Sequence, residues 1–370
     1  MSRGSFITSP RFREISQQLF EKHARDPQIS PDAHFKSKSD ELRNELQGKK
    51  LLYLDTCHWV NLRHVVLGSP SERPGYRQIL ETLRRLHAQR VIRCPISFLL
   101  FLELMKQTDP KTLIATAQLM DEFSGGLCFQ FPIELARFEL RQMLLEGLVG
   151  SEVAKRTGCP WTMTGFLCGE MWPEIASLPQ ETRCLIGKVW IDLMWAVRLE
   201  QIVGTVKPSN LVTDFWKRYA AASNADAVFY RTSQLPYSDV LQREKALLTR
   251  KLMMEELPHV ERELWDAFPQ CRDPAWLKQL PEYSPWNLPS LQILAGISAA
   301  DMVTPKKFEP NDMLDYRHAA LAIPYCDAVF CDIPTAARLR SKPCDFGKVY
   351  DTEILGQPAE ISSYLNKLLG

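Results

Sequence analysis

The sequence predicts an α/β fold with a central parallel sheet, interrupted by a large and mostly α-helical insertion. Two observations carry this prediction. Short apolar runs that end on an aspartate occur at residues 51–55 and 327–332, and such runs are typical of buried parallel strands. Between them lies a long stretch in which helical periodicity replaces strand-like patterning. The expected organisation is a helical N-terminal arm over residues 1–48, an α/β domain made of residues 49–148 and 308–370, and a helical insertion over residues 149–307.

The composition is that of an ordinary globular protein. The chain has 370 residues, with 45 basic and 44 acidic side chains, so its net charge of +1 gives no overall attraction to nucleic acid. No apolar run approaches the roughly 20 residues that a membrane-spanning helix needs, and the N-terminus lacks the apolar stretch of a signal peptide. The 10 cysteines include no closely spaced CxxC pair, which indicates reduced thiols. We therefore expect a cytoplasmic protein without a membrane partner.

Helical and strand patterns alternate in the first part of the chain. The arm carries apolar side chains at helical spacing around Ile15 and a second short helical pattern over residues 39–46. The apolar run at 51–54 predicts the first strand, and a stripe of isoleucine and leucine side chains predicts a helix over residues 75–89. The pattern then predicts a strand over 91–96, helices over 98–106, 111–123 and 132–146, and a short strand over 127–131.

The insertion and the C-terminal part are predicted in the same way. Helical periodicity within the insertion is clearest over residues 182–202 and 237–257. After the insertion the pattern returns to α/β. The expected elements are a helix over 313–323, a strand over 327–332, a helix over 335–340, an edge strand over 348–350 and a closing amphipathic helix over 361–369.

Four acids stand out by their positions in these elements. Asp55 and Asp332 each end a predicted strand, Glu103 interrupts an apolar helix, and Asp315 lies in the first turn of another helix. Ligands of open α/β sheets bind beyond the carboxyl ends of the strands, where carboxylates brought together would repel each other. A divalent cation relieves this repulsion, and an oxygen-only ligand set suits Mg²⁺ or Mn²⁺. The sequence therefore predicts a metal-binding carboxylate cluster.

The order of these motifs resembles the PIN domain family of nucleases. In that family the first strand ends in Asp followed by Thr or Ser, as in Leu54-Asp55-Thr56, and a Glu corresponding to Glu103 lies on the helix after the second strand. The family's helix opening Asp-Ala-Leu-His-Leu-Ala is similar to the helix that opens with Asp315 and includes His318, and its next strand is similar to the one that ends at Asp332. The resemblance covers roughly residues 49–148 and 308–370, and nothing in it corresponds to the helical insertion.

This resemblance implies a PIN-like three-layer α/β/α domain of the Rossmann type, with the activity of a metal-dependent nuclease. The implied substrate is nucleic acid, with RNA favoured over DNA, and the implied cofactor is Mg²⁺ or Mn²⁺. The implied catalytic and metal-binding residues are Asp55, Glu103, Asp315 and Asp332, with Asp312 as an additional candidate ligand. Thr56 and His318 are expected to orient the ligands or a water from outside the ligand set.

The sequence leaves other interpretations open. A PIN-like fold can serve as a catalytically silent nucleic-acid-binding or scaffold module, and the same active site would suit a structure-specific DNA nuclease. The insertion could guide substrate, form a homodimer interface or bind a regulatory protein partner. A phosphatase of the haloacid dehalogenase type is disfavoured, because it requires a second aspartate two residues after the first, where Cys57 stands.

Overall fold

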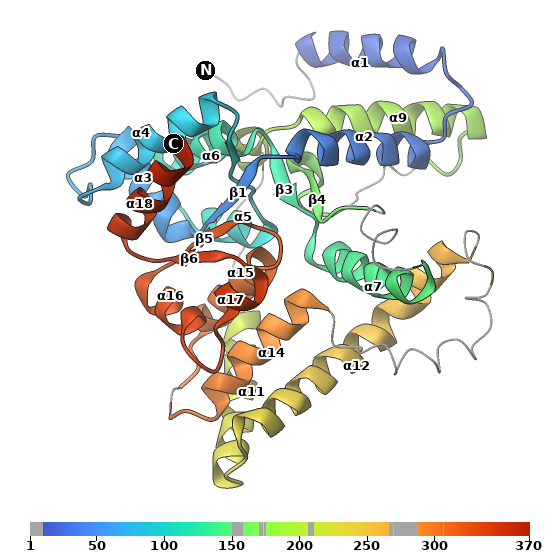
Figure 1. The fold of residues 1–370 in the computed structure, drawn as a ribbon. Coiled ribbons are helices and arrows are strands. Elements are labelled where there is room, and N and C mark those ends of the chain that lie inside the picture. Colours follow the sequence, from blue (N-terminus) through green and yellow to red (C-terminus); the bar gives the residue numbers. More distant parts are fainter. Residues whose placement is uncertain are drawn as a thin grey trace.

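A computed structural model describes most of the chain (Figure 1). The described residues are 10–149, 158–169, 173, 175–205, 211–265, 269, 288–305 and 307–370. None of the helices within them is long and apolar enough to cross a membrane.

A four-stranded parallel sheet forms the centre of the α/β part, as the sequence predicts. Its strands lie in the order β2 (Ile92–Arg93), β1 (Lys50–Leu54), β5 (Ala328–Phe330) and β6 (Glu353–Leu355). The central pair is β1 and β5, in which Leu54 lies opposite Phe330. Because all four strands are parallel, their carboxyl ends meet at one edge of the sheet.

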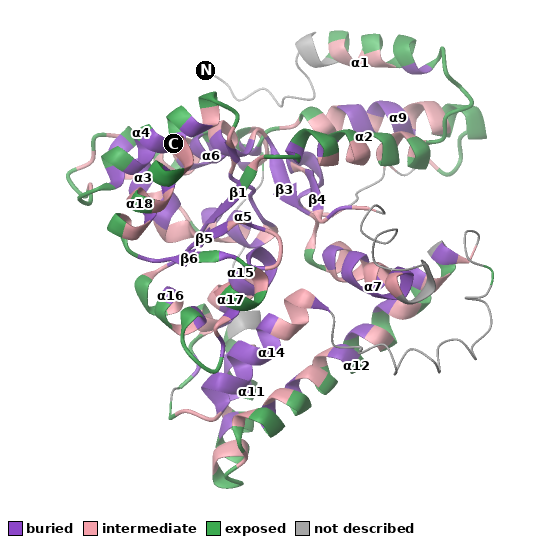
Figure 2. Cartoon of the chain, in the orientation of Figure 1, coloured by how far each residue is buried: buried purple, intermediate pink, exposed green. Residues whose placement is uncertain are grey.

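Helices cover both faces of this sheet (Figure 1). The chain first adds β2 on one side of β1 and later adds β5 and β6 on the other side. Because right-handed crossovers that run in opposite directions place their helices on opposite faces, both faces of the sheet are covered. On one side α3, α4 and α6 pack together with the closing helix α18, and on the other α15 contacts α5. The bounds are α3 Thr56–Val66, α4 Tyr76–Ala88, α5 Phe98–Leu104, α6 Pro110–Ser124, α15 Pro310–Ala322, α16 Ile333–Arg340, α17 Phe346–Tyr350 and α18 Pro358–Leu369. The main hydrophobic core lies between these layers, where the strands are almost entirely buried (Figure 2).

The N-terminal helices pack on the helical insertion. Helices α1 (Pro10–His23) and α2 (Pro31–Leu46) both contact α9 (Gln180–Ala196), and the three lie together in Figure 1. Helix α2 begins eight residues earlier than the sequence pattern predicts, because its first two turns are polar and lack an apolar stripe. The other helices of the insertion are α10 Leu199–Val203, α11 Leu211–Thr232, α12 Tyr237–Leu264 and α14 Pro289–Met302, and α7 Pro132–Val149 immediately precedes the insertion.

Two strand predictions are wrong. Residues 348–350 were expected to form the edge strand, but they belong to α17, and the edge strand is β6, which follows after a turn. The insertion also contains a strand that its helical pattern did not predict. This strand, β4 (Trp161–Met163), pairs antiparallel with β3 (Leu127–Phe129) and leads into the short 3₁₀ helix η2 (Thr164–Phe166).

A buried carboxyl group joins α7 to the segments around the sheet. Glu139 accepts hydrogen bonds from the Tyr325 hydroxyl (2.6 Å) and from the Ser290 hydroxyl (2.8 Å). Burial raises the pKa of Glu139 to about 7, and the hydrogen bonds oppose this shift only in part. The native protein therefore keeps a proton on Glu139 at pH values where the unfolded chain has lost it.

This difference predicts a pH-dependent stability. Because the pKa of Glu139 is raised in the native state, its stabilising effect is complete below the unfolded pKa and is lost as the pH rises toward 7. We expect the free energy of unfolding of the wild type, relative to Glu139→Gln, to fall by about 2–3 kcal/mol between pH 4.5 and pH 8. Urea unfolding of both proteins at several pH values measures this difference. A difference that stays constant with pH would contradict the prediction.

Candidate metal centre

Each of two neighbouring strands is followed by an aspartate at the same edge of the sheet, and each aspartate caps the helix that comes next. Asp55 follows β1 and caps the N-terminus of α3, where its carboxylate accepts a hydrogen bond from the backbone N–H of Thr56 (2.7 Å). Asp332 comes two residues after β5 and caps α16 by accepting from the N–H of Thr335 (2.7 Å). Since β1 and β5 are paired and parallel, these two carboxylates lie at the same edge of the sheet, where the charge of Asp332 acts on Asp55.

Glu103 and His318 complete the inner part of the site. The Thr56 hydroxyl donates a short hydrogen bond to Oε2 of Glu103, and Nε2 of His318 lies 3.4 Å from the same oxygen. Asp55, Glu103 and His318 each offer one potential ligand atom, and these atoms lie within 4.8 Å of one another. Glu103, which the sequence shows as a lone acid in an apolar helix, thus has both a hydroxyl and an imidazole partner.

Asp315 lies at the same site, on α15 one turn before His318. Together with Asp55 and His318 it lines a cavity of about 10 Å³, which is roughly the space that one water molecule needs. Burial and the charge of Asp55 raise the pKa of Asp315 to about 7, and the charge of Asp332 adds to this shift. The structure therefore brings together all four acids that the sequence singled out as a cluster.

The electrostatics of the cluster favour the neutral form of two of its carboxyl groups, Asp55 and Asp315. Burial raises the pKa of Asp55, the charge of His318 opposes this shift only in part, and the charge of Glu103 adds to it. Burial also acts to raise the pKa of Glu103, but the His318 and Thr56 side chains outweigh it, so this pKa is lowered. The pKa of His318 is raised despite burial, because Glu103 and Asp55 favour the charged ring. One ion pair thus satisfies Glu103, whereas Asp55 and Asp315 repel each other.

The predicted ligand Asp312 and the side chain of His58 have other contacts. Asp312 accepts a hydrogen bond from the backbone N–H of Glu309 (2.8 Å) and so helps to cap α15. His58 contacts the backbone oxygen of Cys331 (3.0 Å) and the Tyr76 hydroxyl (2.9 Å), which is a buried structural role. The metal-binding role of Asp312 remains a prediction that these contacts do not support.

Sequence analysis missed the residues that hold His318 in place. The hydroxyl of Tyr53 lies 2.5 Å from Nδ1 of His318 and 2.8 Å from the Ser97 hydroxyl, which itself caps α5. Tyr53 is two residues before Asp55 on β1, so the two side chains point to the same face of the strand. That alternation was the available signal, but a tyrosine in an apolar strand is more typical of a core residue.

Comparisons with known proteins found no match: no protein-family model, no curated protein and no solved structure is similar to this chain.

Proposed function

We propose that the chain is a metal-dependent nuclease that hydrolyses phosphodiester bonds, with RNA as the preferred substrate. The observation that carries the proposal is that Asp55, Glu103 and His318 offer ligand atoms within 4.8 Å of one another, while Asp315 and Asp332 lie close enough to interact with this group through their charges. Burial and neighbouring negative charges raise the pKa values of two of these carboxyl groups, Asp55 and Asp315, and a bound divalent cation would favour their ionised forms. The preference for RNA rests on the resemblance to PIN domains alone.

The donor set fits Mg²⁺ or Mn²⁺. Asp55 and Asp315 supply carboxylate oxygens around a cavity the size of one water molecule, and hard divalent cations prefer such ligands. When bound, the ion would activate a water and stabilise the negative charge that develops on the phosphate.

The protein's own groups have distinct roles in this proposal. Glu103 is held by Thr56 and His318, and His318 is held in turn by Tyr53, so the ligand set is fixed before substrate binds. Asp332 is fixed by its capping bond and adds negative charge beside Asp55. The exposed Lys106, whose charge acts on Glu103, is placed to contact a phosphate group of the substrate.

The test is a cleavage assay on labelled single-stranded RNA and DNA in Mn²⁺, Mg²⁺ or EDTA. We expect cleavage that requires the metal and is lost in Asp55→Asn. The matched control is Asp327→Asn, because Asp327 lies at the amino end of β5 and contacts Lys50 (2.6 Å), away from the cluster. This control should cleave like the wild type.

Two outcomes would decide against a nuclease. Absence of cleavage by folded wild-type protein with either metal would favour the silent binding or scaffold module. Cleavage that persists in Asp55→Asn would assign it to another site or a contaminant. Cleavage of structured DNA but not of RNA would support the proposed active site and would identify DNA, not RNA, as its substrate.

A further inference from the structure

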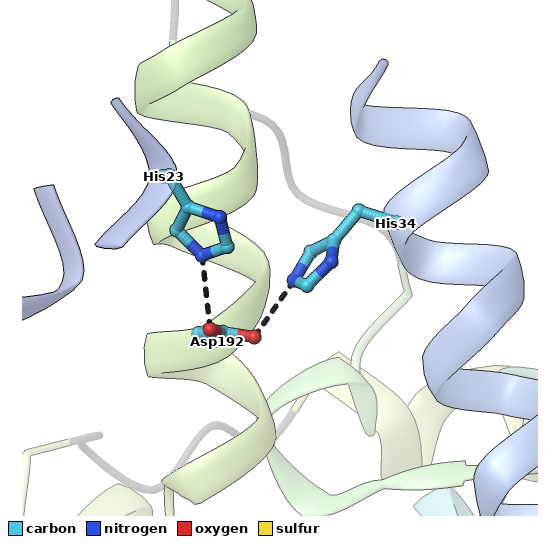
Figure 3. Close-up of side chains that lie close together, drawn as sticks. All are labelled: His23, His34 and Asp192. Carbon is cyan, nitrogen blue, oxygen red and sulfur yellow. Dashed lines mark hydrogen bonds and ion pairs between the residues drawn. The ribbon is translucent and has the colours of Figure 1, made fainter. Parts of the chain in front are cut away.

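A second cluster of potential metal ligands lies far from the carboxylates, where three helices meet. His23 is the last residue of α1, His34 lies in α2 and Asp192 in α9. Figure 3 shows both imidazole rings directed at the same carboxylate. Nε2 of His23 lies 3.0 Å from one carboxylate oxygen of Asp192, and Nε2 of His34 lies 2.8 Å from the other. The three ligand atoms are within 4.8 Å of one another.

The cluster is buried and its backbone is held in place. The side chains of His23 and Asp192 are each only 6% exposed, and that of His34 is 14% exposed. Lys188, one turn before Asp192 on α9, is also buried and donates hydrogen bonds to the backbone oxygens of His23 (3.3 Å) and Asp26 (2.6 Å). The end of α1 is therefore fixed on α9 independently of the imidazole contacts, so a ligand would meet a preorganised site.

The chemistry of these donors differs from that of the carboxylate cluster. Two imidazole nitrogens and one carboxylate oxygen are the ligands of a Zn²⁺-type cation, with a fourth tetrahedral position left for water. Mg²⁺ prefers oxygen ligands and octahedral geometry, so it does not suit this set. The cluster of His23, His34 and Asp192 therefore favours a transition-metal cation over Mg²⁺.

Two lysines compete for the same carboxylate. Nζ of Lys22 lies 2.9 Å from one oxygen of Asp192, and Nζ of Lys38 lies 3.6 Å from the other. The Lys22 side chain is 57% exposed and that of Lys38 is 24% exposed, so both ammonium groups can turn into solvent on flexible stems. In the metal-free protein these cations balance the charge of Asp192, and a bound metal would replace them.

We propose that His23, His34 and Asp192 form a binding site for Zn²⁺ or a similar transition-metal cation, which fastens the two N-terminal helices to α9. The site joins segments that are distant in the sequence, so bound metal would stabilise their packing. This inference does not depend on the proposed nuclease function.

The test is a titration of EDTA-treated full-length protein with Zn²⁺ in competition with a chromophoric chelator, in buffer that contains Mg²⁺ to occupy the carboxylate cluster. We expect one equivalent to bind and the unfolding midpoint to rise. His34→Gln should weaken binding by roughly tenfold or more, while Asp55→Asn should bind Zn²⁺ like the wild type. Lys22→Met should tighten binding by roughly threefold, because it removes the competing ammonium group.

A spectroscopic measurement separates loss of ligand from loss of fold. Co²⁺ in place of Zn²⁺ should give the visible absorption of a tetrahedral nitrogen and oxygen site in the wild type and in Lys22→Met, and His34→Gln should reduce it while keeping the wild-type circular dichroism. The proposal is overturned if the wild type binds no Zn²⁺, or if binding is unchanged in His34→Gln but lost in Asp55→Asn.

Discussion

Asp315→Asn is expected to abolish metal-dependent cleavage and at the same time to stabilise the metal-free protein. Burial and the charge of Asp55 raise the pKa of Asp315 to about 7, so ionising this group in the folded protein is costly. An amide of the same shape removes that charge. At pH 8 in EDTA we expect the free energy of unfolding to rise by roughly 1–2 kcal/mol, and in Mn²⁺ the cleavage rate should fall by about a hundredfold to a thousandfold. Urea unfolding and the cleavage assay measure the two effects.

Asp312→Asn is the matched control, since it makes the same chemical change one turn earlier on α15. The asparagine oxygen can still accept the capping hydrogen bond from Glu309. We expect the stability to change by less than about 0.5 kcal/mol and cleavage to continue. If Asp312→Asn loses cleavage as Asp315→Asn does, Asp312 is a ligand after all. If Asp315→Asn lowers the free energy of unfolding in EDTA, the carboxylates of the metal-free cluster do not repel each other.

Gly165→Ala is expected to destabilise the protein by at least about 3 kcal/mol. A Cβ atom at Gly165 would overlap the backbone carbonyl of Met194 at the end of α9, with the carbonyl carbon only 2.7 Å away. The backbone of η2 cannot easily withdraw, because the N–H and hydroxyl of Thr164 both donate to the oxygen of Gly126 (2.8 and 2.9 Å). Phe166 is also fixed, edge to face against Phe35.

Gly204→Ala provides the comparison for Gly165→Ala. Gly204 is exposed and has helical dihedral angles, and a Cβ there would come no closer than 3.4 Å to the oxygen of Glu200. We expect a change of about 0.5 kcal/mol in either direction. Chemical denaturation of both variants measures the difference. A Gly165→Ala protein within about 1 kcal/mol of the wild type would mean that η2 and α9 do not pack this closely.

The elements that the sequence predicted well are those with a long or distinctive pattern. The isoleucine and leucine stripe of α4 extends over about two turns, and the run before Asp55 is apolar throughout, so both elements lie where they were expected. Strand β4 has only three residues, too few for a period to be read, and its partner β3 lies much earlier in the chain. Residues 348–350 are again too few to distinguish a strand from a helical turn, and they form the last part of the short helix α17, whose first residue, Phe346, is buried.

The candidate site was predictable to the extent that sheet topology fixes it. Parallel pairing of β1 and β5 places Asp55 beside Asp332, and this follows once both strands are recognised. Thr56 and His318 were expected near the ligands, and both contact Glu103. Tyr53 was missed because its hydroxyl acts on groups from α5 and α15, and no local pattern reports such long-range contacts. The second cluster was missed for the same reason.

The pairing of β1 with β5 also has a consequence for how the protein is made. Strand β1 leaves the ribosome early, whereas its neighbour β5 and the acids Asp315 and Asp332 follow only after the whole insertion. Until then one edge of an apolar strand lacks its partner, which exposes the growing chain to aggregation and makes it a target for chaperones. A polypeptide that stops within the insertion would carry half of the carboxylates and no completed sheet. A cell that synthesises this protein would thus be protected from its proposed nuclease activity until translation is almost finished.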